Sequence, residues 1–219
     1  MAMDERKVST PPRRCVIIGA APVEDGSCLP GISPEDFVIC ADGGLLHAKT
    51  MGITPDLVLG DFDSLENKAL LSGFSTLQLP VEKDDTDTMA AIKLGLEKGY
   101  RSFWITGGMG GRSDHTFANY TALLYLVQHG AEGILTDGWE FVTVLGEGIY
   151  SYTGKVGWGL SVFPFGCAEA VFSESGVYYP LKEHTLTADF PLGVSNTVTE
   201  DPAVLQVHRG NILLFLRKN

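Results

Sequence analysis

Acidic residues follow four apolar stretches in the first half of the chain. They belong to the motifs ADGG with Asp42, GDFDS with Asp61 and Asp63, EKDDTD with Asp84, Asp85 and Asp87, and GGMGGRSDH with Asp114. A single aspartate in such a place is well explained as a helix cap. Acidic clusters gathered at one edge of a sheet would repel one another unless a cation lay among them. Because Mg²⁺ prefers carboxylate oxygens and often shares phosphate oxygens, the motifs favour a site for magnesium and a polyphosphate.

Glycine-rich turns are the candidates for binding the phosphate groups. TGGMGGR, which contains Gly107, Gly108 and Arg112, lies between an apolar stretch and a helical pattern. It offers close approach to the backbone, unpaired amides at a helix start and one guanidinium for a phosphate oxygen. It matches neither G-x-x-x-x-G-K-[ST] nor G-x-G-x-x-G, and a purely structural role for the two glycines stays open. IIGAAP, with Gly19, is a weaker candidate for a phosphate loop.

The elements that must position these residues alternate between strand and helix patterns. The expected strands are CVIIG, FVICA, DLVLG, STLQL, SFWIT and GILTD, and the expected helices are 45–51, 86–98 and 114–129. Helix 86–98 is expected to be capped near Asp84 or Asp85. The alternation predicts a mostly parallel, Rossmann-like sheet with helices on both faces, in three layers. Ligands of such sheets gather at the carboxyl ends of the strands, where the acidic motifs lie, and Phe62 is expected to point back into the fold.

After Trp139 the pattern changes to short β-branched and aromatic stretches separated by Gly, Pro and Asn. These stretches are EFVTVLG, GLSVFPF, AEAVFSES, HTLTADF, AVLQVHR and NILLFLRK. They predict a small all-β sandwich or barrel. We therefore expect a disordered lead-in at 1–14, an α/β domain at 15–140 and an all-β domain at 141–219.

Composition restricts the partners of the protein. Its 219 residues carry a net charge of −11 without a cluster of Lys and Arg, which argues against binding to nucleic acid. No stretch approaches the about eighteen apolar residues of a membrane span, and no apolar core of signal-peptide length precedes the first strand. The cysteines, Cys15, Cys28, Cys40 and Cys167, have no C-x-x-C spacing and are expected to be free thiols in a reducing cytoplasm. The histidines show no metal-ligand spacing.

Taken together, the motifs resemble those of the thiamine pyrophosphokinase (thiamine diphosphokinase) family. ADGG, TPDLVLGDFDS, EKDDTD and GGMGGRSDH with Asn119 occur in that family's order and spacing, and GVSN at 193–196 follows YYPL as it does there. The resemblance implies an enzyme that uses ATP as co-substrate, with Mg²⁺, to transfer a pyrophosphoryl group to the hydroxyl of thiamine, giving thiamine diphosphate and AMP. It also implies nucleotide binding and catalysis at 15–140, thiamine binding at 141–219, and a homodimer with thiamine bound between subunits.

The resemblance further implies roles for individual residues. Asp61, Asp63 and Asp87 would be catalytic and would hold the metal. Ser195 and Asn196 would receive the pyrimidine of thiamine from the partner subunit. The nucleotide and its surroundings would be contacted by Asp42, Gly43, Asp84, Thr86, Gly107, Gly108, Arg112, Asp114 and Asn119.

The proposed chemistry suits these residue types independently of the family. An alcohol that attacks phosphorus needs charge neutralisation and alignment more than a strong base, and either Asp61 or Asp87 could accept its proton. Three alternatives stay open: a magnesium-dependent phosphatase with Asp61 as nucleophile, a diphosphokinase that acts on a pterin alcohol, and a non-catalytic nucleotide-sensing module. The GVSN motif in the β-rich half favours thiamine over a pterin.

Overall fold

The computed structural model describes residues 13–23, 29, 31–62, 68–80, 82 and 84–219. Asp63 and Cys28, together with residues 1–12 of the expected lead-in, lie outside the described residues. All statements below concern the described part of the chain.

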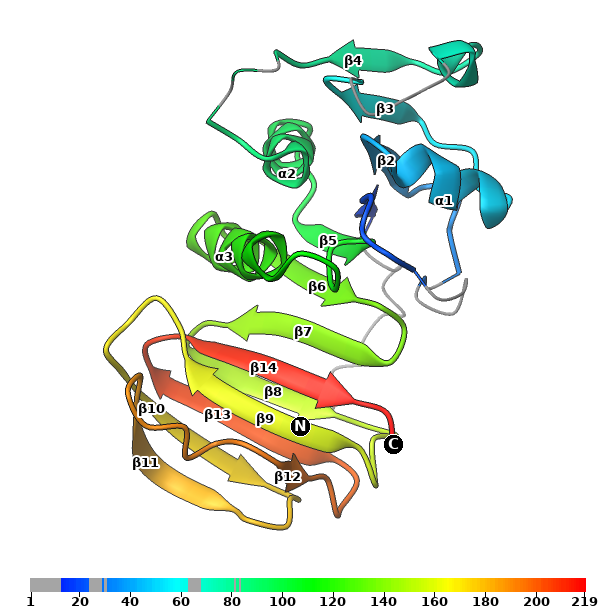
Figure 1. Cartoon of the computed structure of the whole chain (residues 1–219). Helices are drawn as coiled ribbons and strands as arrows, with labels where there is room; N and C mark the ends of the chain where they lie inside the picture. The colour runs from blue at the N-terminus through cyan, green and yellow to red at the C-terminus, as the bar shows by residue number, and fades with distance from the viewer. Residues whose placement is uncertain (1–12, 24–28, 30, 63–67, 81, 83) are drawn as a thin grey trace, which may run out of the picture.

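The first half of the chain forms the parallel part of a large sheet (Figure 1). Its strands are β1 (Arg14–Ile18), β2 (Phe37–Ala41), β3 (Leu57–Gly60), β4 (Thr76–Gln78), β5 (Ser102–Thr106) and β6 (Glu132–Thr136). They lie in the order β6-β5-β1-β2-β3-β4, and all neighbours run parallel. The chain therefore builds the sheet outward from β1 to β4 and returns to the other side of β1 with β5. In open α/β sheets, ligands bind at such a reversal of strand order.

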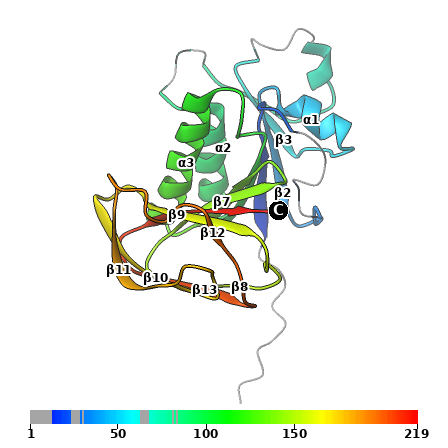
Figure 2. The same cartoon turned by 60° about the horizontal axis from the view of Figure 1, so that its bottom comes forward.

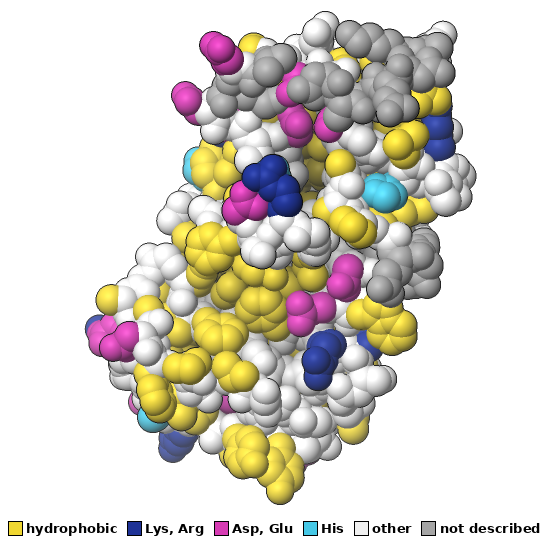
Figure 3. All heavy atoms as spheres, viewed as in Figure 1, with side chains coloured by type: hydrophobic (Ala, Val, Ile, Leu, Met, Phe, Trp, Pro, Cys, Tyr) yellow, Lys and Arg dark blue, Asp and Glu magenta, His cyan; other side chains and the backbone are white. Residues whose placement is uncertain are grey.

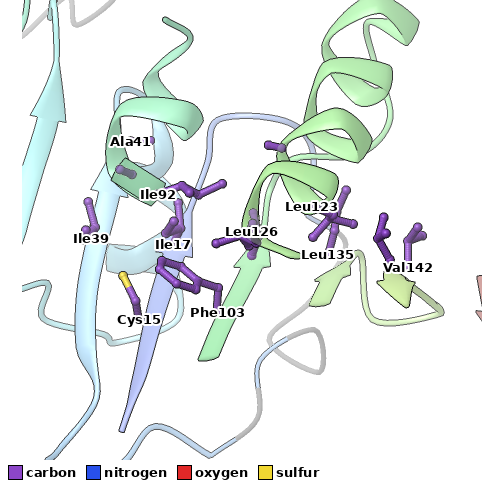
Figure 4. Close-up of a cluster of buried hydrophobic side chains, with 14 of the residues drawn as sticks. Cys15, Ile17, Ile39, Ala41, Ile92, Phe103, Leu123, Leu126, Leu135 and Val142 are labelled. Atoms are coloured by element: carbon purple, nitrogen blue, oxygen red, sulfur yellow. The ribbon is translucent and has the colours of Figure 1, made fainter. Parts of the chain in front are cut away.

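Helices cover both faces of the parallel strands. They are α1 (Gly44–Thr50) on one face and α2 (Asp87–Glu97) and α3 (Ser113–Gln128) on the other (Figures 1 and 2), with a short 3₁₀ helix at Lys68–Leu71. On the side of α2 and α3, Ile92 and Leu126 pack in one cluster with Ile17 and Phe103 (Figure 4). The neighbouring Ile18 belongs to the cluster beneath α1. Successive strand residues are thus buried on opposite faces, which explains the unbroken apolar runs in the sequence and confirms the predicted mostly parallel sheet.

The second half of the chain contributes strands to two sheets. The large sheet continues past β6 through β7 (Glu140–Leu145), β14 (Ile212–Arg217), β9 (Gly159–Pro164) and β12 (Asn196–Thr197), with antiparallel pairing. A separate antiparallel sheet has the order β11-β10-β13-β8, with β8 (Gly148–Tyr152), β10 (Glu169–Ser175), β11 (Leu181–Thr187) and β13 (Ala203–Arg209). The two sheets enclose a second apolar core, to which Leu160 and Leu214 come from the large sheet and Phe172 and Leu205 from the other.

The large sheet crosses residue 140, where the sequence pattern indicates a boundary between two domains. Strands β7, β14, β9 and β12 therefore belong both to this large sheet and to the pair of sheets that encloses the second core. A tight turn explains the continuity: Asp137 Oδ1 accepts the N–H groups of Trp139 at 2.9 Å and Glu140 at 2.8 Å, and β7 folds back beside β6. Alternation of apolar and polar residues predicts a strand but does not specify which strand it pairs with.

Smaller differences concern individual elements. β8 and the short β12 are absent from the strands expected from sequence, because their residues are mixed in polarity. The capping residue of α2 is Thr86, which follows Asp85 directly. In the described part of the chain, no helix combines the length and apolar character needed to cross a membrane.

Candidate active site

A cavity of about 260 Å³ lies at the carboxyl ends of β1, β2 and β5, where the strand order reverses. Carboxylates from three of the acidic motifs line this acidic cavity, namely Asp42, Asp61 and Asp87, and Gly107 and Gly108 of the glycine-rich turn line it too. Figure 3 shows acidic side chains at the upper end of the molecule, over the α/β part. The parallel topology therefore brings these motifs together at one edge of the sheet, as the sequence predicts.

The ends of β2 and β3 bring Asp42 close to the GDFDS motif. Asp42 and Phe62 both have left-handed backbone conformations, with φ of 48° and 58°, which are costly for residues with side chains and occur at functional sites. The N–H of Asp42 donates to the carbonyl of Leu59 at 2.7 Å. A Cβ at Gly60 would lie 3.2 Å from Cα of Asp42, so glycine permits this close approach. Phe62 is 5% exposed and packs beneath α1, which confirms its predicted inward direction.

The start of α2 brings Asp87 to the acidic cavity. Thr86 Oγ1 accepts the N–H of Met89 at 3.1 Å and caps the helix. Asp87 follows in the first turn, where the helix dipole favours a carboxylate. Asp85 is instead held by Lys93, whose Nζ lies 2.7 Å from its Oδ2. Two aspartates of the EKDDTD motif thus differ in their surroundings: Asp87 lines the cavity, and Asp85 forms an ion pair with Lys93 of α2.

The start of α3 carries an exposed ion pair beside the glycine-rich turn. Arg112 Nη2 lies 2.6 Å from Oδ2 of Asp114, and Nε lies 3.2 Å from its Oδ1. The hydrogen bond from Arg112 lowers the pKa of Asp114. Farther along the helix, the buried Asn119 donates from Nδ2 to the carbonyl of Gly108 at 2.8 Å. Asn119 thereby joins α3 to the glycine-rich turn, while the guanidinium of Arg112 stays at the surface.

The ends of β1 and β5 meet backbone to backbone in the lining of the cavity. The N–H of Gly19 donates to Thr106 O at 2.8 Å, and that of Ala21 donates to Gly107 O at 2.8 Å. A Cβ at Gly107 would lie 2.3 Å from Gly19 O, and a Cβ at Gly19 would lie 2.4 Å from Gly107 O. Both positions therefore require glycine. Without side chains here, a phosphate group could approach the backbone closely.

The carboxylates of the acidic cavity suit a metal ion that is shared with phosphate. Among the described residues, no three Asp, Glu, His or Cys side chains come close enough to enclose an ion by themselves. Mg²⁺ does not require such a cage, because one or two carboxylates with phosphate oxygens and water commonly complete its octahedral shell. Asp61 and Asp87, which line the same cavity, fit this donor set.

A second cavity, of about 230 Å³, lies on the antiparallel part of the large sheet and contains the other predicted residues. Ser195 and Asn196 line this Ser195 cavity together with Ser161, Phe215 and Arg217. No described residue lines both this cavity and the acidic one. Within one chain, the residues expected to bind thiamine therefore line a different cavity from Asp61, Asp87 and the glycine-rich turn.

The residues that line the acidic cavity differ in part from those predicted from the sequence. Among the predicted nucleotide contacts, Gly43, Asp84, Arg112 and Asp114 are not part of the described cavity lining. His115 does line the acidic cavity, although its spacing from other histidines indicates no ligand role. Its place in GGRSDH, at the start of α3, was the signal that could have identified it.

A larger cavity of about 520 Å³ is lined by residues of β5, β6, β7 and β8. Its lining includes Trp104, Phe141, Tyr150 and other mainly apolar residues. A polyphosphate needs hydrogen-bond donors and charge neutralisation, which this lining offers poorly. The acidic cavity is therefore the better candidate for chemistry.

Family models match both halves of the chain. The model described as "Thiamin pyrophosphokinase, catalytic domain" matches residues 31–135, and that described as "Thiamin pyrophosphokinase, vitamin B1 binding domain" matches residues 153–212. Together they cover about three-quarters of the chain. The first includes the acidic motifs, and the second includes Ser195 and Asn196.

Individual relatives carry the same descriptions. The chain is 28% identical over 184 residues to the thiamine pyrophosphokinase of Bacillus subtilis, an alignment that covers 82% of this chain and 86% of the relative. It is 24% identical over 185 residues to thiamin pyrophosphokinase 1 of Caenorhabditis elegans, covering 78% and 74%. The crystal structure of the B. subtilis protein has the same fold, with a TM-score of 0.85 and 22% identity over 94% of this chain and all of that one. The yeast structure has a TM-score of 0.76 at 14% identity, covering 96% and 87%.

Proposed function

Because the chain belongs to the thiamin pyrophosphokinase family, we infer that it transfers the pyrophosphoryl group of ATP to the hydroxyl of thiamine, giving thiamine diphosphate and AMP. The observation that carries this inference is the acidic cavity at the reversal of strand order, within the part that matches the catalytic model. The same chain supplies a second part that matches a vitamin B1 binding model.

The reaction requires one new bond to phosphorus. The hydroxyl oxygen of thiamine attacks the β-phosphorus of ATP, the bond from that phosphorus to the oxygen bridging to the α-phosphorus breaks, and AMP leaves. We propose that Asp61 or Asp87 accepts the hydroxyl proton, since both line the acidic cavity. The backbone at Gly19, Gly107 and Gly108 would lie along the phosphate chain and hold it in line with the attacking oxygen.

We propose that Asp61 and Asp87 hold Mg²⁺, together with Asp63, which lies outside the described residues. When bound, the ion neutralises charge on the phosphate oxygens. The aspartates would hold the ion in place beside the phosphate oxygens. Thr86 caps the helix whose first turn carries Asp87. In this proposal the nucleotide is also contacted by Asp42 and Asn119 in the cavity and by the exposed Arg112 beside it.

The proposed function predicts a specific pair of products. Incubation of the protein with ATP, Mg²⁺ and thiamine is expected to yield AMP and thiamine diphosphate in equal amounts, detected by mass spectrometry. Omission of thiamine serves as the control and should abolish AMP formation. ADP with thiamine monophosphate, or no product, would contradict the proposal, because a whole pyrophosphoryl unit must move in a single transfer.

The same experiment separates the alternative functions. A phosphatase with Asp61 as nucleophile would release phosphate without thiamine, and a nucleotide-sensing module would bind ATP without forming AMP. A pterin diphosphokinase would form AMP only when a pterin alcohol replaced thiamine. The matches to the catalytic and vitamin B1 binding models favour none of these alternatives.

We propose that a second copy of the chain completes the site. Phe117 packs edge-to-face on Phe165, and Tyr120 and Phe163 both pack edge-to-face on Phe215. We call these five residues the aromatic face, of which Phe117 is 60% exposed. Figure 3 shows a broad hydrophobic area across the middle of the molecule. Exposed apolar patches of this kind mark protein interfaces. Phe215 also lines the Ser195 cavity, so a partner docked on the aromatic face would lie next to the proposed thiamine residues.

A composite site predicts that two inactive variants restore each other. Asp61→Asn impairs the acidic cavity, and Ser195→Lys places a positive charge against the cationic thiamine. In a mixed dimer, one site carries both changes and the other carries neither, so random mixing should recover about 25% of wild-type activity. The measurement is the AMP-forming rate of the co-expressed, co-purified variants, with each variant alone as control. A rate no higher than that of the separate variants would show that each site lies within one chain.

A further inference from the structure

Glu174 interrupts the apolar side of β10. Ala170 and Phe172 on this side are core residues between the two sheets, and the next residue on the same side is Glu174, which is only 3% exposed. Burial of a carboxylate costs free energy unless hydrogen bonds offset it. A departure from the strand pattern that persists in a packed core points to a role beyond packing.

The carboxylate of Glu174 contacts the GVSN motif through Asn196. Glu174 Oε1 accepts from Asn196 Nδ2 at 3.0 Å. The same Nδ2 donates to Tyr179 O at 2.9 Å, while Asn196 Oδ1 accepts the N–H groups of Tyr179 at 3.0 Å and Thr197 at 2.9 Å. These bonds use both donor hydrogens of the amide and both lone pairs of its oxygen. The amide of Asn196 is therefore occupied within the fold and forms part of the framework of the Ser195 cavity.

The hydrogen-bonded Asn196 directly follows Ser195 in the chain, and both residues line the Ser195 cavity. The backbone of Ser195 is left-handed, with φ of 63°, and its N–H donates to Ser161 Oγ at 3.1 Å. Ser195 is exposed and lines the Ser195 cavity. A residue in this conformation keeps its geometry only when its surroundings hold it. Ser161 accepts the backbone N–H of Ser195, and the hydrogen-bonded Asn196 is the next residue in the chain.

We propose that Glu174 is a positioning residue of the thiamine site, which fixes the amide of Asn196 and thereby the turn that presents Ser195 to thiamine. This inference rests on the proposed function for the identity of the substrate. Glu174 acts through Asn196 and does not contact thiamine itself. The amide of Asn196 correspondingly stabilises the turn through its hydrogen bonds within the fold. The hydroxyl of Ser195 is the group presented to the ligand.

The chemistry of Glu174 offers a matched pair of variants. Burial raises the pKa of Glu174 to about 7, while the hydrogen bond from Asn196 acts in the opposite direction. Oε2 has no hydrogen-bond partner among the described residues, so Oε1 is the atom that the role requires. Glu174→Gln keeps an oxygen acceptor for Asn196 at nearly the same volume. Glu174→Leu fills the same space but removes the acceptor, and Glu174→Met does so with a more flexible side chain.

The first test separates positioning from general stability. We expect Glu174→Leu to raise the KM for thiamine by about tenfold, as expected when a buried donor loses its partner, with KM for ATP and kcat nearly unchanged. Glu174→Gln is expected to restore the KM for thiamine. A purely structural role would instead reduce the fraction of active protein and so lower the apparent kcat alone. If Glu174→Leu fails to fold, Glu174→Met is measured in its place.

A second test needs neither substrate nor turnover. Hydrogen exchange of the backbone amides at 193–197 is expected to accelerate in Glu174→Leu and to stay at the wild-type rate in Glu174→Gln. Unchanged exchange and an unchanged KM for thiamine in the apolar variant would overturn the inference. A wild-type protein that forms no product would overturn the proposed function instead, and the exchange rates would still decide whether Glu174 holds the turn.

Discussion

Asp61→Asn is expected to lower kcat at least about 100-fold, on the scale of removing one group that stabilises charge in a transition state. Asp61 lines the acidic cavity with Asp42 and Asp87, and asparagine keeps its shape while removing the charge proposed to hold Mg²⁺. Because the change also relieves repulsion between carboxylates, the thermal midpoint should stay within about 2 °C of wild type or rise. Steady-state AMP formation and thermal unfolding measure the two effects.

Asp85→Asn is the matched control for this prediction. Asp85 belongs to a neighbouring acidic motif but forms an ion pair with Lys93, and both side chains are partly exposed. A solvent-exposed pair of this kind contributes little to stability, and its loss should leave turnover within about threefold of wild type. Equal losses of turnover in the Asp61 and Asp85 variants would mean that net charge, and not the cavity, controls the rate. A large loss of stability in Asp61→Asn would identify Asp61 as a structural cap.

Gly107→Ala is expected to destabilise the protein by about 3 kcal/mol or more, which would place it among the severe single substitutions. The added Cβ would lie 2.3 Å from Gly19 O and 2.8 Å from Gly19 C, both of them backbone atoms that have no rotamer with which to move away. The left-handed backbone, with φ of 64°, accounts for roughly 1–2 kcal/mol of the loss. The remainder comes from separating the ends of β1 and β5. Urea unfolding at 25 °C and the affinity for ATP are the measurements, and both should fall.

Gly110→Ala separates these two causes within the same turn. Gly110 is also left-handed, with φ of 79°, but a Cβ there would meet no atom within 4 Å. Its substitution should therefore cost only the conformational part, roughly 1–2 kcal/mol. If the two variants lost the same free energy of unfolding, the contact between Gly107 and Gly19 would not be the reason that glycine is needed.

Much of the candidate site could be predicted because its residues follow strands that can each be recognised from their own local sequence. A stretch such as DLVLG is apolar on both sides and ends in glycine and aspartate, so its burial and its functional end are both local properties. Parallel pairing then requires such ends to meet at one edge, and Asp42, Asp61 and Asp87 do meet there. The division of EKDDTD between Asp87 in the cavity and Asp85 in an ion pair was not readable, because Lys93 lies two helical turns away.

The sequence by itself determined the α/β and β-rich halves, the acidic edge and the family motifs, because burial on one or both faces and the chemistry of a turn are encoded within a few residues. Tertiary structure alone decided the strand order. That order places Gly19 against Gly107, carries the large sheet past residue 140 and buries Glu174 behind Asn196. The physical reason is that a strand's pattern specifies which side chains face the core, whereas its neighbour is selected by backbone hydrogen bonds and packing between residues far apart in the chain.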